Sequence, residues 1–416
     1  MKKTLAILLA AMLMLGLVPA LAENESLGTI TVWYGGSGEG ANRVALYQAA
    51  KEKIEADYPG TVVEIVEVPY NEMQSRQLTV CRSHTGVPDV MSQSITWTYA
   101  FMQEDLLQPV DELLKERGRD LLAEFNPAYF ESMTGADSRI YGVPQSRTAQ
   151  CLVYNKTLFD EAKVKVPTNW EELEDAAKKL TLTREDGTKQ YGYAVPGTSK
   201  GNIWFRLIPD IWSAGGEVFK DGKATLNTPE AKEGIAHYCH WYLEGMAPDS
   251  TMENDSSLIG KMMAAGTVAM YTDNIGFVNS NIKDVIDVGI ALWPGKNGTI
   301  DAGMGGWNIV IPKDAPNPKG GAVFIDYVTN EEGMDSQLLF PALAASLKSE
   351  KWNEGIYPTY ADQIANHVRE LPALIDLSGA QDVLMAMVQS IMTGDATLDD
   401  AVEQANDELQ AILDNE

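Results

Sequence analysis

The sequence predicts an α/β protein made of two units, and the first hundred residues give the clearest reason. Residues 29–34 and 61–68 are short and rich in β-formers, and the apolar side chains between them recur at helical spacing until Pro59-Gly60. A third strand is expected at residues 87–91 after another helical segment. Alternation of this kind predicts mostly parallel strands joined by right-handed crossovers.

The second reason is a segment that leads out of one unit and into another. Gly142 and Pro144 punctuate an extended run, because a residue before proline is pushed towards extended geometry, and residues 149–154 follow as an apolar strand. We therefore expect Gln145 and Arg147 to lie where the two units face each other.

Further strands and helices follow in the same alternation. Thr168 and Glu171 have the spacing of a capping box, and Trp170 should lie on the apolar face of the helix that they begin. Strands are expected at residues 267–271, 288–292 and 307–311, and the C-terminal quarter is helical in pattern.

The first 22 residues have the three parts of a secretory signal. Lys2 and Lys3 precede an apolar run, and Ala20-Leu21-Ala22 is a small-x-small cleavage site. The run is shorter than a membrane span requires, and no cysteine follows it. We expect cleavage, no lipid anchor, and a soluble protein that is secreted to the periplasm or the cell exterior.

Charge and composition exclude several classes of function. The formal net charge is −27, which argues against nucleic acid or an anionic membrane as a partner. The three cysteines are too few for a disulfide framework and are better read as small buried side chains, although one bridge stays possible. His237 and His240 share a helix face without further ligands nearby, so no metal is expected.

The glycine loop at residues 35–40 does not have the order of a dinucleotide fingerprint, and it carries an acid where a pyrophosphate would lie. No cofactor is therefore expected. Ligands of open parallel sheets collect beyond the carboxyl ends of strands, which makes Ser37 and Glu39 candidates after the first strand, and Gln93 and Trp97 after the third.

Later in the chain, a polar turn and two aromatic segments add candidates. Asp273 and Asn274 follow an apolar strand, and Trp204 lies near a helix start where its ring could face a cleft. Gly305 and Gly306 would allow close approach of a ligand beside Trp307, whose removal should then weaken binding more than stability. A glycine turn that only places Trp307 in the core is the alternative.

The ordered set of motifs resembles the solute-binding proteins of ABC importers, in the sugar-carrying family that includes the maltose-binding protein. The matching features run through nearly the whole mature chain: TVWY at 31–34, Pro59-Gly60, Pro88-Asp89-Val90, Tyr141 to Pro144, Tyr154-Asn155-Lys156, Thr168 to Trp170, Gly215-Gly216, Ala269-Met270, and Gly305-Gly306-Trp307 leading to Ile311-Pro312-Lys313.

The resemblance implies a two-lobed periplasmic-binding-protein-like fold, a monomer that closes on its ligand by hinge bending and delivers it to membrane permease subunits. It implies an N-terminal lobe of residues 23–142 plus 273–318 and a C-terminal lobe of 143–272 plus 319–416, with hinge crossings near 141–145, near 271–274 and after 311. The ligand contacts carried across are Ser37, Glu39, Gln93, Trp97, Gln145, Arg147, Trp204, Phe205, Asp273, Asn274, Gly305, Gly306 and Trp307.

One departure from the family pattern narrows the range of expected ligands. Maltose binders carry a stacking tryptophan at the start of the helix before the last, where this sequence has Gln381. Sugar remains the expected ligand, because planar polar side chains interleaved with rings suit hydroxyl groups and C–H faces. The alternatives are a non-sugar solute in the same fold and a secreted glycosidase, which would need two carboxylates about 5–10 Å apart.

Overall fold

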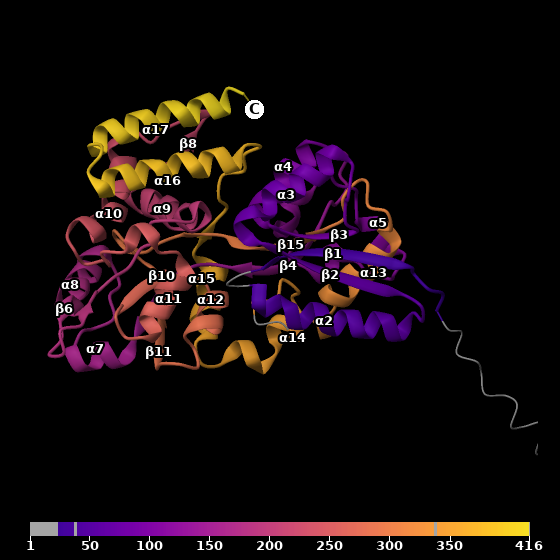
Figure 1. Cartoon of the computed structure of the whole chain (residues 1–416), viewed down its shortest axis with the longest axis horizontal. Coiled ribbons are helices and arrows are strands. Elements are labelled where there is room, and N and C mark those ends of the chain that lie inside the picture. Colours follow the sequence, from indigo (N-terminus) through magenta and orange to yellow (C-terminus); the bar gives the residue numbers. More distant parts are fainter. Residues whose placement is uncertain (1–23, 37–39, 337–338, 416) are drawn as a thin grey trace, which may run out of the picture.

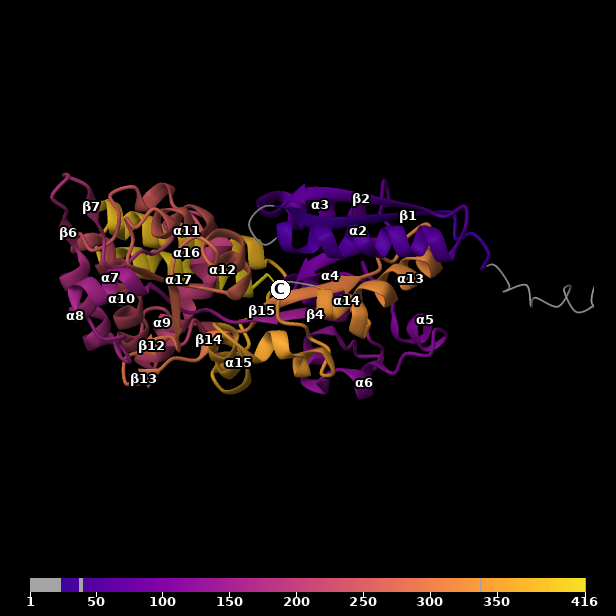
Figure 2. The same ribbon diagram turned by 90° about the horizontal axis from the view of Figure 1, so that it is seen from below.

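The computed structural model describes residues 24–36, 40–336 and 339–415, and they form two lobes side by side (Figures 1 and 2). The expected signal sequence lies outside these residues. In the described part, no helix combines the length and apolarity of a membrane span.

The N-terminal lobe is built on a five-stranded sheet. Its strand order is β2-β1-β3-β15-β4, with β1 (Thr29–Gly36), β2 (Val62–Pro69), β3 (Val90–Ser94), β4 (Val143–Thr148) and β15 (Gly305–Val310). The three N-terminal strands are parallel, as predicted, whereas β15 runs antiparallel to both of its neighbours. The helices of this lobe are α2 (Gly40–Asp57), α3 (Tyr70–Ser83), α4 (Ile95–Gln103), α5 (Asp111–Lys115), α6 (Leu121–Glu124), α13 (Pro318–Thr329) and α14 (Glu331–Ser336).

The C-terminal lobe has a smaller sheet and a thicker helical cover. Strand β5 (Cys151–Asn155) lies between β10 (Met270–Asp273) and β11 (Val288–Ala291), and both pairings are antiparallel. The expectation of mostly parallel strands is therefore wrong for this lobe, because alternation of elements along the chain does not fix the direction in which a strand enters the sheet. Its helices are α7 (Lys156–Ala162), α8 (Trp170–Leu180), α9 (Lys200–Ala214), α10 (Pro229–Leu243), α11 (Ser256–Ala264), α12 (Ile275–Asn281), α15 (Tyr357–Asn366), α16 (Leu377–Thr393) and α17 (Leu398–Leu413).

Helices α16 and α17 form the outer layer above α9 and α10, and the start of α16 approaches α4 of the other lobe (Figure 1). Two-stranded pairs complete the fold: β6 (Leu182–Thr183) with β7 (Lys189–Gln190), β8 (Phe219–Lys220) with β9 (Lys223–Ala224), β12 (Pro294–Gly295) with β13 (Gly298–Thr299), and β14 (Ala302–Gly303) with β16 (Val368–Arg369).

The strand pairings place the boundaries between the lobes at other residues than the sequence predicted. Residues 143–148 pair as β4 with β15 and so belong to the N-terminal lobe, as do α13 and α14, which pack against α2. Helix α12 and strand β11 belong instead to the C-terminal lobe. The chain passes between the sheets at residues 149–150, between β4 and β5, and at Met304, between β14 and β15. A third passage follows α14, because α14 packs on α2 whereas α15 packs on β5 and β11. The crossings expected near 141–145 and near 271–274 fall within one lobe, whereas the one expected after 311 does occur, beyond α14.

Local signals at helix starts explain why the elements begin where they do. Thr228 caps α10 by accepting from the Ala231 amide, and a proline takes the first helical position. The capping box of α8 is shifted by one residue from the prediction: Asn169 is the cap and accepts from the Glu172 amide, while the Glu172 carboxylate accepts from the Thr168 amide at 2.9 Å.

Candidate functional site

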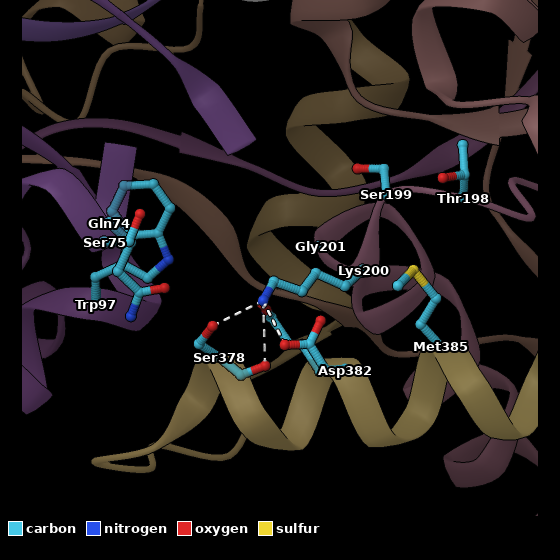
Figure 3. Close-up of a pocket in the computed structure, with 11 residues that line it drawn as sticks. Gln74, Ser75, Trp97, Thr198, Ser199, Lys200, Gly201, Ser378, Asp382 and Met385 are labelled. Carbon is cyan, nitrogen blue, oxygen red and sulfur yellow. Dashed lines mark hydrogen bonds and ion pairs between the residues drawn. The ribbon is translucent and has the colours of Figure 1, made fainter. Parts of the chain in front are cut away.

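A pocket of about 280 Å³ lies between the two lobes (Figure 3). The N-terminal lobe contributes Gln74 and Ser75 from α3 and Trp97 from α4. The C-terminal lobe contributes the remaining lining residues, which come from the entry to α9 and from the first turns of α16: Thr198, Ser199, Lys200, Gly201, Ser378, Gln381, Asp382 and Met385.

The wall of the C-terminal lobe is organised by the Lys200 ammonium group. Lys200 Nζ donates to Ser378 Oγ at 2.7 Å and to Asp382 Oδ2 at 2.8 Å, and it lies 3.4 Å from the Ser378 carbonyl oxygen (Figure 3). Ser378 and Asp382 are four residues apart on α16, so both side chains rise from one helix face towards the pocket. The contacts join the start of α9 to the start of α16 and fix the shape of this wall.

The start of α9 also leaves backbone donors at the pocket edge. Ser199 precedes the helix with φ 65° and makes no side-chain cap. A positive φ is uncommon outside glycine and is typical of sites held in place by their surroundings. The first-turn amides of a helix have no partner within it, so they are available to acceptor atoms of a ligand.

The wall of the N-terminal lobe carries the indole of Trp97. Behind it lies Trp307, whose ring meets Trp97 edge to face, with centroids 6.1 Å apart and an interplanar angle of 81°. The Arg43 guanidinium lies 3.6 Å from the Trp307 ring centroid, and a Cβ atom on Gly35 would lie 3.2 Å from Trp307 Cη2. Trp307 is 5% exposed and belongs to the core. Trp97 is equally buried, at 4% exposed, and belongs to the same cluster, but Trp97 lines the pocket and Trp307 does not. The structure thus favours the alternative in which the glycine turn places Trp307 in the core, and a ligand contact at Trp307 stays a prediction.

The two predicted glutamines are buried inside the N-terminal lobe. Gln93 on β3 donates to Gln77 Oε1 at 3.3 Å, and Gln145 on β4 accepts from the Tyr47 hydroxyl at 3.2 Å. Neither lines the pocket between the lobes. Their hydrogen bonds connect helices to the sheet.

Arg147 ties together three elements next to the crossing. Its guanidinium donates to the Ser146 carbonyl at 2.9 Å, to Asn308 Oδ1 at 3.3 Å and to the Tyr129 carbonyl at 3.1 Å, and it stacks over the Tyr129 ring. Burial lowers the pKa of Arg147 to about 10, so the side chain stays charged at neutral pH. These contacts connect strands β4 and β15 to the short 3-10 helix at Pro127–Met133.

The candidates from the C-terminal lobe are mostly engaged in its interior. Trp204 is fully buried in the core, which contradicts the prediction that its ring faces a cleft. Asp273 pairs with Arg206 at 3.0 Å between two buried side chains. Asn274 caps α12 by accepting from the Gly276 amide at 2.8 Å. Phe205 is half-buried.

The two predicted glycines serve the packing of strands. Gly306 has φ +137°, and a Cβ atom there would lie 2.2 Å from the Ser146 carbonyl oxygen, so only glycine lets β15 approach β4. A Cβ atom on Gly305 would lie 2.8 Å from Thr148 Oγ1 and 3.3 Å from the Phe205 ring. Ser37 and Glu39, the first two candidates, lie outside the described residues.

Of the predicted site residues in the described chain, the structure thus brings only Trp97 to the pocket. The sequence interpretation missed Lys200, Ser378 and Asp382, which are remote in sequence from the strands that it used as guides. Gln381, the residue at which this sequence departs from maltose binders, lines the pocket.

The histidines and cysteines considered in the sequence analysis pack against other side chains of the fold. His237 stacks on Trp170 with centroids 3.7 Å apart and contacts Asp210 Oδ2 at 3.1 Å. Within the described residues, no group of three or more His, Cys, Asp or Glu side chains could hold a metal ion. Cys81, Cys151 and Cys239 are buried and unbridged, which confirms their interpretation as small buried side chains.

Comparison with known proteins gives related sequences and folds. A binding protein of Brucella abortus is 26% identical over 242 residues, which are 57% of this chain and 56% of that protein, so the match spans little more than half of the relative. YcjN of Escherichia coli, named for a periplasmic-binding role in an ABC transporter, is 22% identical over 439 residues and covers both chains fully. The structure of a solute-binding protein of Thermotoga lettingae superposes with a TM-score of 0.83 at 23% identity, covering 93% of this chain and 100% of the other.

The sequence model of the bacterial extracellular solute-binding protein family matches residues 38–335, which is most of the chain. This match and the two-lobed fold confirm the resemblance seen in the sequence motifs. The protein belongs to the family of bacterial extracellular solute-binding proteins.

Proposed function

We propose that the protein binds a sugar in the pocket between its lobes and delivers it to the permease subunits of an ABC importer. The observation that carries this proposal is the chemistry of the two walls. One wall offers the Trp97 indole, and the other offers Lys200, Ser378, Gln381 and Asp382. A sugar has C–H faces that pack on an aromatic ring and hydroxyl groups that both donate and accept hydrogen bonds, so it fits between such walls.

Two relatives support the transport role and the ligand class. The Thermotoga lettingae protein was crystallised with α-D-tagatose, a sugar, and the Escherichia coli protein YcjN is named as part of an ABC transporter. Closure of the lobes would add contacts from the second wall, and a ligand stabilises the closed form to the extent that it binds that form better.

The pocket favours binding over catalysis. Among its described lining residues, Asp382 is the only carboxylate, whereas glycoside hydrolysis uses a pair. The protein is proposed to act as a secreted monomer after removal of residues 1–22, without nucleic acid as a partner.

Differential scanning fluorimetry against mono- and oligosaccharides tests the function. A saturable rise in melting temperature, with the sugar recovered chemically intact by chromatography, is expected for at least one sugar. Turnover of the sugar would support an enzyme instead. No shift with any sugar, and a shift with a peptide or polyamine, would place a non-sugar solute in the pocket.

A further inference from the structure

We infer that the pocket selects a neutral sugar over the corresponding acidic sugar, and that Asp382 determines this preference. The inference rests on the proposed function and concerns its substrate class. It follows from how the charges of the pocket wall are paired.

The one cation among the described lining residues is already neutralised. An ammonium group has three N–H donors. Lys200 Nζ has three oxygen neighbours within 3.4 Å: Ser378 Oγ, the Ser378 carbonyl and Asp382 Oδ2. A carboxylate on the ligand would have to compete with Asp382 for this ammonium group.

Asp382 also offers a hydrogen-bond acceptor that only a ligand hydroxyl can use. Its side chain is 55% exposed, and its second carboxylate oxygen can accept from a ligand hydroxyl. A ligand carboxylate cannot donate such a bond, and it gains little net attraction from the Lys200–Asp382 pair, because the two charges of the pair offset each other. A hydrogen bond to a charged group is strong enough that its loss should weaken binding by roughly tenfold.

The donors that remain at the pocket edge do not reverse this preference. The uncapped start of α9 presents backbone amides, which favour any acceptor atom. A hydroxyl oxygen can accept from these amides while its proton is donated to Asp382. A hydroxyl group therefore satisfies both sides of the wall, and a carboxylate satisfies only one.

Isothermal titration calorimetry with matched pairs of probes tests this inference: D-glucose with D-glucuronate, D-galactose with D-galacturonate, and cellobiose with cellobiouronic acid. For any pair that binds, the wild-type protein should prefer the neutral member at least about tenfold. Asp382→Asn should reduce this preference at least about tenfold, because Lys200 then lacks its counter-charge and can pair with the ligand.

A matched control is Asp399→Asn, which removes an exposed lysine–aspartate pair with Lys232 elsewhere in the same lobe, and it should leave the preference unchanged. Equal affinity for both members in the wild-type protein, or a preference that Asp382→Asn leaves intact, would overturn the inference while sugar binding stands. Absence of binding by every neutral and acidic probe would overturn the proposed function and the inference with it.

Discussion

Replacement of Trp307 by alanine should lower the stability of the ligand-free protein strongly. The ring is buried between the Arg43 guanidinium, the Gly35 backbone and the edge of Trp97. Truncation of a fully buried tryptophan costs about 3–5 kcal/mol, because the transfer free energy is lost and a cavity remains. For a domain of 150–250 residues, each kcal/mol lowers the melting temperature by roughly 2–4 °C.

Urea unfolding followed by circular dichroism, without ligand, measures this loss. Trp212→Ala is the matched control, since Arg369 stacks over that ring at 4.3 Å but Trp212 is only half-buried, and its loss should be about 1–2 kcal/mol. If Trp307→Ala unfolded at the wild-type urea concentration while sugar binding disappeared, the ring would be a ligand contact and its placement in the core would be refuted.

Three further predictions follow from single contacts. Gly306→Ala should cost roughly 2–4 kcal/mol in urea unfolding, because its Cβ atom would collide with the Ser146 carbonyl; a wild-type midpoint would contradict this strain. Asn274→Ala should lose about 1 kcal/mol through the α12 cap with an unchanged Kd for sugar, whereas a tenfold weaker Kd would make Asn274 a ligand contact. Burial raises the pKa of Asp210, despite its contact with His237, so the folded protein binds this proton more tightly than the unfolded chain. The contribution of Asp210 to stability should thus fall as pH rises from about 4 through the raised pKa, and the difference in unfolding free energy between wild type and Asp210→Asn should change over that range; a pH-independent difference would refute it.

The fold class could be predicted because hydrophobic periodicity and helix caps depend on residues that are close together in the sequence. Strands β1, β2 and β3 and their parallel pairing follow from alternation of short apolar runs with helical segments. Lobe boundaries were misplaced where pairing is decided by distant partners. Strand β4 pairs with β15, more than 150 residues later, and nothing within residues 143–148 indicates that partner.

The candidate site was less predictable for the same reason. The contact between Lys200 and Asp382 joins residues 182 positions apart, and a lysine at a helix start has no pattern of its own. Trp97 lies just after β3 and Trp307 lies near the start of β15, opposite Ser94 at the end of β3, yet Trp97 lines the pocket and Trp307 packs behind it. Only side-chain packing distinguishes these two roles.

The most direct test of the account is to fill the pocket from its exposed wall. Ser75→Trp places a large side chain in the pocket from the surface of α3. The matched control is Thr79→Trp, which adds the same side chain one helical turn away, where α3 does not line the pocket. Both positions are exposed, so neither variant should change the ligand-free melting temperature. In isothermal titration calorimetry with the sugar that gives the largest thermal shift, Ser75→Trp should abolish binding and Thr79→Trp should bind like the wild-type protein. Full affinity in Ser75→Trp would contradict a sugar site between the lobes.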